Sequence, residues 1–118
     1  MIPNIRCGID IVYIPRFELL LKDPSFKARI FSAEESLLPL KSLAGNFAIK
    51  ESFIKACLNE TRTIDFSALE VKRNENGAPY LYSNSSELNK VIKNVISISI
   101  SHDTDYCIGI LLASFETA

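Results

Sequence analysis

The stretch AGNFAIKESFIKACL, residues 44–58, is the longest helical candidate in the sequence. On a wheel at about 100° per residue, its apolar side chains cover most of the circumference. The remaining polar arc is narrow and carries Glu51, Ser52 and Lys55, with Ala48 between them. A helix with so wide an apolar surface is mostly buried, so we expect the rest of the fold to pack around it.

Lys50 departs from this pattern, because its position on the wheel points into the apolar arc. A lysine in such a place must extend its ammonium group to solvent, meet an acidic partner or meet a bound anion. The sequence leaves these three alternatives open.

A strand and several short helices are predicted before the long helix. Residues 4–14 alternate with a period of two, which is typical of a half-buried strand, and this alternation puts Asp10 on the same face as Gly8. Three short helices are expected next: one from Pro15 to the Asp23-Pro24 break, one over 25–31, and one that begins at the capping-box pattern Ser32-Ala33-Glu34-Glu35 and ends near Pro39.

A β-hairpin is predicted after the long helix. Residues 68–74 and 80–83 flank the pair Asn76-Gly77, which supplies the positive backbone dihedrals of a tight turn. Pro79 follows directly, where the second strand would begin.

The last third of the sequence predicts a short helix and two strands. The helix covers 85–93, and residues 95–101 then alternate isoleucine with serine. The turn that follows holds His102, and the nearly continuous apolar run 106–114 suits a central or interface-covered strand that returns antiparallel. We therefore predict an α+β fold, in which an antiparallel sheet packs with one long helix and several short ones.

Composition is consistent with one domain over residues 1–118. A chain of 118 residues buries roughly two thirds of its unfolded surface, which is enough for a core without disulfides. Thirteen basic and fourteen acidic residues give no basic excess for nucleic-acid binding.

Three widely spaced cysteines and the lack of a long apolar run favour a cytoplasmic protein that is neither exported nor inserted in a membrane.

The spacing of chemical groups excludes several enzyme classes. The four glycines are scattered, so that no phosphate-binding glycine loop is formed, and there is no G-x-S-x-G nucleophile elbow. A single histidine without nearby ligands also makes a zinc site improbable. Acidic and basic side chains remain as the candidates.

Asp10 at a strand end, with Glu51 and Lys55 one helical turn apart, could form a hard-cation site beside a phosphate-binding lysine. From spacing alone, Glu51 and Lys55 are equally an ordinary pair on a solvated helix face. Asp10 could be a turn or cap residue, and His102 a hydrogen-bonded turn residue. Spacing therefore leaves both readings open.

Four segments resemble the motifs of the holo-acyl-carrier-protein synthases, the small 4′-phosphopantetheinyl transferases. They stand in the family's order and span about the whole chain: Gly8-Ile9-Asp10-Ile11-Val12 with Ile14-Pro15-Arg16, Leu43–Ala56 with its Lys-Glu pair and second lysine, the hairpin Asn76-Gly77-Ala78-Pro79, and Ile98–Asp103. Four motifs with matching intervals are a specific signal. The resemblance implies the transferase fold and a role in fatty acid and lipid biosynthesis.

The resemblance also implies a reaction. Asp10 and Glu51 would hold Mg²⁺ against the pyrophosphate of coenzyme A, and Lys55 would neutralise phosphate charge while a serine hydroxyl of apo acyl carrier protein attacks. A carboxylate acting through a metal-bound water, or another local base, would accept the proton, and adenosine 3′,5′-bisphosphate would leave. Phosphoryl-type transfer depends chiefly on positioning and charge neutralisation, so these groups are chemically sufficient.

The family further implies a homotrimer with active sites between subunits, one subunit supplying Asp10 and the signature helix and its neighbour supplying the hairpin and the final turn. The residues that would bind coenzyme A are Lys50, Lys55, Asn76, Gly77, Pro79, Ile100, Ser101 and His102. Arg16 matches the arginine that the family uses for docking. Arg16, Lys22, Lys27 and Arg29 would form a local basic surface for the acidic carrier protein.

Three features differ from the family pattern. Asn46 stands where the family commonly has a phosphate-contacting arginine, Ala78 replaces a common lysine, and the glycine-rich stretch after the signature helix is absent. Other cations, such as Lys41, Lys50, Lys72 or Arg62, would then be needed for coenzyme A. The alternative is a non-catalytic homo-oligomeric protein that binds the carrier but uses coenzyme A poorly, although a pure binding role needs none of the metal chemistry.

Overall fold

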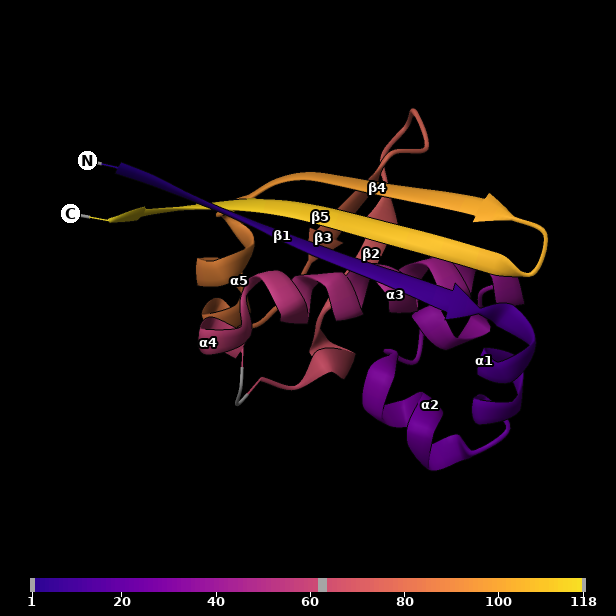
Figure 1. Ribbon diagram of the computed structural model, residues 1–118. Helices are drawn as coiled ribbons and strands as arrows, with labels where there is room; N and C mark the ends of the chain where they lie inside the picture. Colours follow the sequence, from indigo (N-terminus) through magenta and orange to yellow (C-terminus); the bar gives the residue numbers. More distant parts are fainter. Residues whose placement is uncertain (1, 62–63, 118) are drawn as a thin grey trace.

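A long helix, α3 (Leu40–Ala56), lies across one face of a three-stranded antiparallel sheet in the computed structural model (Figure 1). The structure describes residues 2–61 and 64–117. The strand order is β1 (Ile2–Tyr13), β5 (Tyr106–Thr117) and β4 (Val95–Asp103). The apolar run near the end of the sequence is therefore the central strand, as predicted, and the α+β prediction is confirmed.

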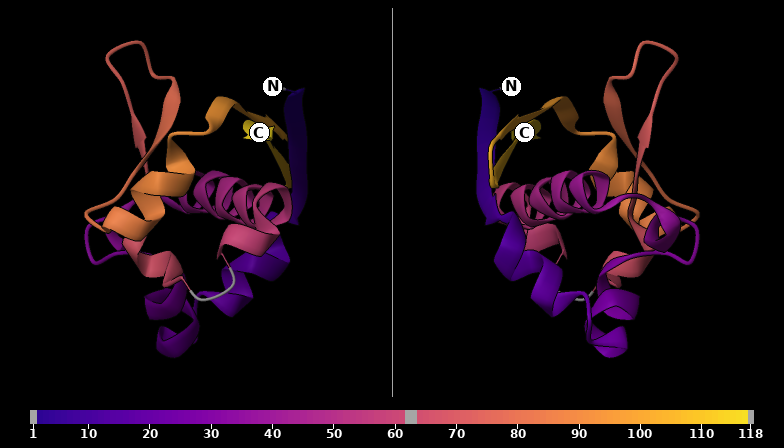
Figure 2. Two further views of the ribbon diagram at one scale, coloured as in Figure 1. Left: turned by 90° about the vertical axis from the view of Figure 1, so that its left-hand side faces the viewer. Right: turned by 90° about the vertical axis from the view of Figure 1, so that its right-hand side faces the viewer.

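The predicted hairpin forms a separate two-stranded sheet. Its strands are β2 (Glu70–Arg73) and β3 (Pro79–Tyr82), and they pair antiparallel. Gly77 at the turn has a φ of 83°, a conformation that glycine adopts without steric cost. The turn projects well beyond the rest of the fold (Figure 2).

The helix boundaries differ from the prediction in two places. The short helices are α1 (Ile14–Leu20), α2 (Pro24–Ile30), α4 (Leu58–Thr61) and α5 (Ser86–Ile92), with single 3₁₀ turns η1 (Glu35–Leu37) and η2 (Phe66–Ala68). The helix expected to end near Pro39 is thus a single turn. Pro39 has an extended ψ of 157° and acts as the N-cap of α3, so the long helix begins four residues before the predicted position 44 and ends before Cys57.

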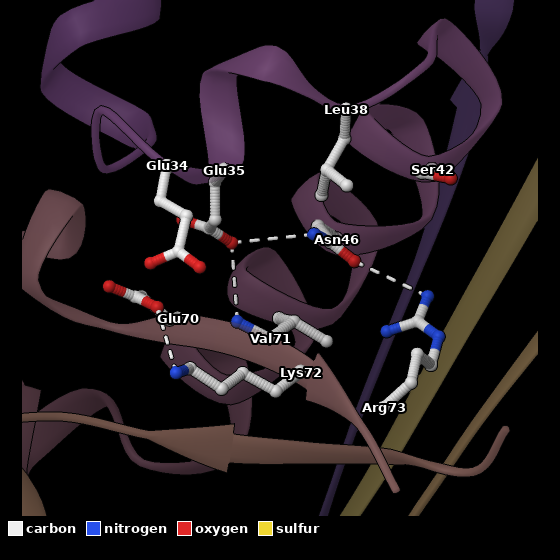
Figure 3. Close-up of a pocket in the computed structure, with 9 residues that line it drawn as sticks. All are labelled: Glu34, Glu35, Leu38, Ser42, Asn46, Glu70, Val71, Lys72 and Arg73. Carbon is white, nitrogen blue, oxygen red and sulfur yellow. Dashed lines mark hydrogen bonds and ion pairs between the residues drawn. The ribbon is translucent and has the colours of Figure 1, made fainter. Parts of the chain in front are cut away.

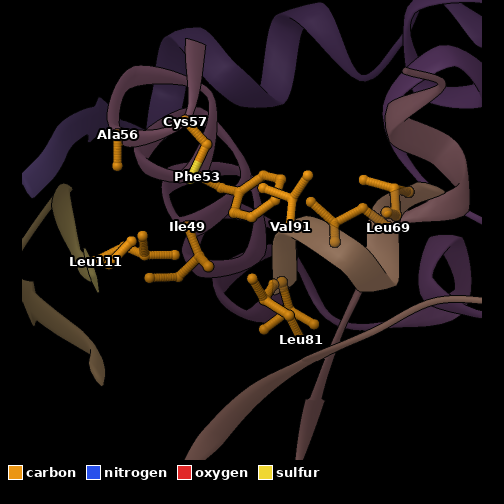
Figure 4. Packing of buried hydrophobic residues seen from close by; sticks show 11 residues of the cluster. Ile49, Phe53, Ala56, Cys57, Leu69, Leu81, Val91 and Leu111 are labelled. Carbon is orange, nitrogen blue, oxygen red and sulfur yellow. The ribbon is translucent and has the colours of Figure 1, made fainter. Parts of the chain in front are cut away.

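The core lies between α3, the sheet and the hairpin (Figure 4). Ile49 and Phe53 of α3 are fully buried, and Leu111 of β5 packs in the same cluster. A second cluster joins α1 and the start of α3, where the rings of Phe17 and Phe47 stack with centroids 5.1 Å apart. The predicted wide apolar surface of the long helix is confirmed.

Two glycines allow α3 to lie directly on the sheet. A Cβ at Gly8 of β1 would be 1.8 Å from the carbonyl oxygen of Ser52, and one at Gly109 of β5 would be 2.9 Å from the carbonyl carbon of Ala48. The Ser52 hydroxyl also lies 2.9 Å from the carbonyl oxygen of Gly109. This close contact holds the polar arc of α3 against β1, where Asp10 lies.

The other face of the sheet carries exposed apolar side chains. Ile5, Ile9 and Ile11 of β1 are 54–60% exposed, and Tyr106 and Ile108 of β5 are also exposed. The predicted alternation of β1 is therefore present, but the isoleucines face away from α3, while Gly8 and Val12 are buried. Among the described residues, no helix is both long and apolar enough to cross a bilayer.

Candidate functional site

Asp10, Glu51 and Lys55, the three residues predicted to carry the chemistry, come together where α3 crosses β1. The ammonium group of Lys55 lies 3.3 Å from a carboxylate oxygen of Asp10 and donates to the carbonyl oxygen of Ile9 at 2.8 Å. The close seating of α3 on Gly8 produces this arrangement, because it brings the side chains at 51 and 55 over the end of β1.

The electrostatics of Glu51 are unusual for an acid on a polar helix face. Burial raises its pKa above the ordinary value, and the nearby carboxylate of Asp10 raises it further, while Lys55 lowers it. The carboxylates of Asp10 and Glu51 therefore repel each other across the site. A bound cation would relieve this repulsion.

These two carboxylates are ligands of the kind that Mg²⁺ favours. Mg²⁺ favours one or two protein carboxylates and completes its octahedron with water and substrate phosphate oxygens. No cluster of three or more acidic, histidine or cysteine ligands occurs within residues 2–61 and 64–117. Asp10 and Glu51 could hold an ion that takes its other ligands from solvent and substrate.

A cavity of about 260 Å³ opens beside the carboxylates. Asp10 and Glu51 line one part, and Phe17, Phe47 and Arg16 line another. The sequence placed both phenylalanines only among apolar helix positions, so their role as a cavity wall was not predicted. An acidic end next to an apolar wall and a cation can accommodate a ligand with both phosphate and apolar portions.

Lys50 is buried and paired. Its ammonium group donates to the carboxylate of Glu35 at 2.6 Å and to the carbonyl oxygens of Ile30 and Phe66 at 2.6 and 3.2 Å. These three acceptors use all three N–H donors, and the side chain is 1% exposed. Of the three alternatives for Lys50, the acidic partner is correct. The ammonium group is not available to coenzyme A, and the expectation that Lys50 binds it is corrected.

Glu35 connects this ion pair to the hairpin (Figure 3). The predicted capping box is confirmed, because the backbone N–H of Ser32 donates to the Glu35 carboxylate and the Ser32 hydroxyl accepts from the N–H of Glu35. The same carboxylate accepts from the side chain of Asn46 and from the backbone N–H of Val71. Its four donors come from three separate segments, so Glu35 ties β2 to α3.

A second pocket, of about 250 Å³, lies beside Glu35. Asn46 and Arg73 line it, and the Arg73 guanidinium donates to the side-chain oxygen of Asn46 at 3.4 Å (Figure 3). The sequence gives no indication of Arg73 as a site residue, because no local pattern connects a residue of the hairpin with one of the long helix.

The six other residues predicted to bind coenzyme A lie away from the first cavity. Asn76, Gly77 and Pro79 belong to the hairpin, and the remaining three, Ile100, Ser101 and His102, belong to β4. None of them lines the cavity of Asp10 and Glu51. His102 is exposed, and its Nε2 lies 3.3 Å from the carbonyl oxygen of Lys41.

The residues predicted to dock the carrier protein lie on α1, α2 and the turn between them. Arg16 of α1 is exposed beside the first cavity, with its guanidinium 5.4 Å from the centre of the Tyr13 ring. Lys22 and Arg29 are exposed, and Lys27 is half-buried. Of the other cations considered, Lys72 lies 3.8 Å from Glu70, and Arg62 is outside the described residues.

Comparisons with known proteins identify the family of this chain. The model of the 4′-phosphopantetheinyl transferase superfamily matches residues 6–111. A holo-acyl-carrier-protein synthase of Alkaliphilus metalliredigens is 36% identical over 118 residues, covering 91% of this chain and 96% of its own. The enzyme of the same name from Geobacillus is 33% identical over 115 residues, covering 89% and 92%.

Solved structures show the same fold. A complex of the Chronobacterium ammoniagenes synthase with coenzyme A superposes with a TM-score of 0.79 at 28% identity, covering 97% of this chain and 99% of its own. The Helicobacter pylori synthase in complex with coenzyme A has a TM-score of 0.72 at 30% identity, covering 89% and 96%.

Proposed function

This chain belongs to the 4′-phosphopantetheinyl transferase superfamily, and from that premise we propose that it transfers the 4′-phosphopantetheine group of coenzyme A to a serine of apo acyl carrier protein. The products are holo carrier protein and adenosine 3′,5′-bisphosphate. The convergence of Asp10, Glu51 and Lys55 beside a cavity of about 260 Å³ carries the proposal. The relatives' names and their complexes with coenzyme A do not favour the non-catalytic alternative.

The side chains have separable tasks in this reaction. Lys55 commits two N–H donors to Ile9 and Asp10, so that its third can reach a phosphate oxygen. Its charge would stabilise the phosphate as the serine oxygen attacks the phosphorus and the bond to adenosine 3′,5′-bisphosphate breaks. Burial makes the Glu51 carboxylate more basic than an exposed one, which suits a group near the proton that the serine releases.

Mg²⁺ dependence is part of the proposal. Asp10 and Glu51 would hold the ion, and the mutual repulsion of their carboxylates supports this assignment. When bound, the ion would supply charge neutralisation for the pyrophosphate of coenzyme A. We further infer one transferase domain over residues 1–118, a cytoplasmic location from the three free cysteines, and a role in fatty acid biosynthesis from the family of the chain.

Intact mass spectrometry tests the reaction directly. Apo acyl carrier protein, coenzyme A and Mg²⁺ are incubated with the protein, with one reaction containing EDTA and another containing a carrier without its acceptor serine. A phosphopantetheine adduct that requires both the metal and the serine is expected. A folded protein that forms no adduct with several carriers would revive the non-catalytic alternative.

Replacing Arg16 with alanine is expected to weaken binding of the carrier protein by about three- to tenfold and to reduce its dependence on salt. Arg16 is an exposed cation at the edge of the first cavity, and rim charges chiefly act on association with a charged partner. Calorimetry with apo carrier protein at two salt concentrations measures both effects. The affinity for coenzyme A should stay within about twofold, and an equal loss of both affinities would refute the separation of roles.

We also infer that the chain forms a homotrimer whose interface covers the exposed face of the sheet. Ile5, Ile9 and Ile11 form a contiguous apolar patch there, and such patches commonly mark protein interfaces. The hairpin residues assigned to coenzyme A lie outside the cavity of Asp10 and Glu51, which supports a site completed by a neighbouring subunit.

Replacing Ile9 with lysine is therefore expected to dissociate the trimer, because it places a charge in the centre of the apolar patch. Light scattering after size-exclusion chromatography gives the mass in solution. Leu37, which is 85% exposed on η1, provides the matched control, and Leu37→Lys should leave the trimer intact. A wild-type monomer, or an Ile9→Lys trimer, would contradict this assembly.

A further inference from the structure

Arg73 is a cation without an acidic partner in a pocket where Glu35, Glu70 and Lys72 are paired. The carboxylate of Glu35 is bound to Lys50 at 2.6 Å, and that of Glu70 lies 3.8 Å from Lys72. Among the residues that the structure describes, Arg73 makes no ion pair. Arg73 is exposed at the end of β2, and partial burial of its guanidinium lowers its pKa.

The guanidinium is held in place by a neutral group. Its Nη2 donates to the side-chain oxygen of Asn46 at 3.4 Å, and the side-chain nitrogen of Asn46 donates to Glu35 at 3.3 Å. Asn46 is itself 1% exposed, so its orientation is set by the interior. A planar guanidinium positioned by one hydrogen bond retains donors that can bind a phosphate in a bidentate manner.

The pocket is polarised along its length. In Figure 3, the acidic side chains of Glu34 and Glu70 lie at one end, and Arg73 lies at the other, toward Ser42. An anion would therefore be repelled from the first end and held at the second. Asn46 of α3 carries no charge. The cation at this end of the pocket is therefore Arg73, which comes from the hairpin.

This end of the pocket adjoins the segments assigned to the nucleotide. A Cβ placed on Gly45, the residue before Asn46, would lie 3.3 Å from Ile100 and 3.7 Å from the ring of His102. Arg73 itself is the last residue of the strand that leads into the hairpin turn. Arg73 and Asn46 thus belong to the same side of the subunit as the hairpin and the end of β4.

We propose that Arg73, oriented by Asn46, binds the 3′-phosphate of coenzyme A and thereby selects it over coenzyme A that lacks this group. The inference rests on the proposed function. Asp10, Glu51 and Lys55 already account for the pyrophosphate, so the phosphate monoester is the remaining anionic group of this substrate. A doubly charged monoester also matches the fork of a guanidinium better than a diester does.

Calorimetry with coenzyme A and 3′-dephospho-coenzyme A tests this assignment, because the two ligands differ only in the phosphate monoester. Arg73→Gln removes the charge but keeps an amide near Asn46. It is expected to weaken coenzyme A binding at least about tenfold and to change 3′-dephospho-coenzyme A binding less than about twofold. Arg73→Lys, which keeps the charge without the fork, should fall between Arg73→Gln and the wild type.

Lys90→Ala is the matched control, since it removes one positive charge from the exposed part of α5. Its affinity for both ligands should equal that of the wild type. Equal weakening of both ligands by Arg73→Gln, or no weakening of either, would overturn the assignment, as would a wild-type protein that does not prefer coenzyme A.

The mass-spectrometric assay separates this inference from the proposed function. A wild-type protein that forms the adduct, together with an Arg73→Gln variant that binds coenzyme A normally, would refute the role of Arg73 alone. A protein that prefers coenzyme A through Arg73 but forms no adduct would refute the transferase reaction alone. A wild type that binds neither ligand would contradict both.

Discussion

Glu51→Gln is expected to reduce the rate of phosphopantetheine transfer by at least about a thousandfold while the fold stays intact. The change removes one of the two carboxylates proposed to hold the metal, and bound metal ions typically supply several kcal/mol of charge stabilisation. Initial rates of holo carrier protein formation, measured by mass spectrometry at several Mg²⁺ concentrations, give the effect. Glu87→Gln, on the exposed first turn of α5, is the control and should keep the wild-type rate.

The same variant is expected to raise the thermal stability of the metal-free protein near neutral pH. Burial and Asp10 raise the pKa of Glu51 above 4.5 in the folded state, so its ionised form is less favourable there than in the unfolded chain. Stability contributed by this group is complete below pH 4.5 and is lost as the pH rises through the folded-state pKa. Glutamine avoids that loss.

Melting curves of the wild type and Glu51→Gln across pH therefore provide a second readout. The variant should melt higher at pH 7, and the difference should disappear below the unfolded-state pKa of 4.5. A variant with a normal transfer rate would remove Glu51 from the active site. A variant that melts lower than the wild type at pH 7 would mean that Glu51 stabilises the fold. Its ionised carboxylate would then not be destabilised by burial and by Asp10.

Gly8→Ala is expected to destabilise the protein by about 3 kcal/mol or more, at the upper end of the usual cost of overpacking. The added Cβ would lie 1.8 Å from the carbonyl oxygen of Ser52, and this atom belongs to the backbone of α3. Neither a side-chain rotation nor a small adjustment can relieve such an overlap, so β1 or α3 must move. Urea denaturation measures the loss in the free energy of unfolding.

Gly45→Ala is the matched control for this substitution. Its Cβ would meet the side chain of Ile100 at 3.3 Å, which a small side-chain shift can accommodate, and alanine favours the helix. We expect a change below about 1 kcal/mol. Any Gly8→Ala protein that does fold should also transfer more slowly, because a displaced β1 carries Asp10 away from Lys55. Equal stabilities for the two variants would show that α3 does not need the close approach at Gly8.

Local sequence signals predicted the elements whose structure depends on near neighbours. The Asn76-Gly77 pair specified the hairpin, the Ser32 and Glu35 spacing specified the capping box, and the apolar periodicity of residues 44–58 identified the buried helix. Each of these features arises from interactions within a few residues. Helix ends were predicted less well, since the extended Pro39 starts α3 four residues earlier than apolar periodicity alone suggests.

Residues far apart in the sequence gave weaker signals. Lys50 was recognisable as anomalous, but its partner Glu35 is 15 positions away and could not be chosen from the other acidic residues. Arg73 gave no signal, because its contact with Asn46 spans 27 positions and joins a hairpin to a helix. The exposed face of β1 was likewise undetermined, since alternation shows two faces and does not say which one meets α3.

The sequence by itself determined the α+β fold class and the order of the elements, because local periodicity and turn signals are properties of the chain, and its family motifs predicted Asp10, Glu51 and Lys55 as site residues. The tertiary structure alone decided that Glu51 is held near Asp10, that Lys50 is enclosed by three acceptors, and that Arg73 lies over Asn46. These outcomes depend on how closely α3 approaches the sheet and the hairpin. The approach of α3 to the sheet requires Gly8 and Gly109, because a Cβ at either position would meet the backbone of the helix.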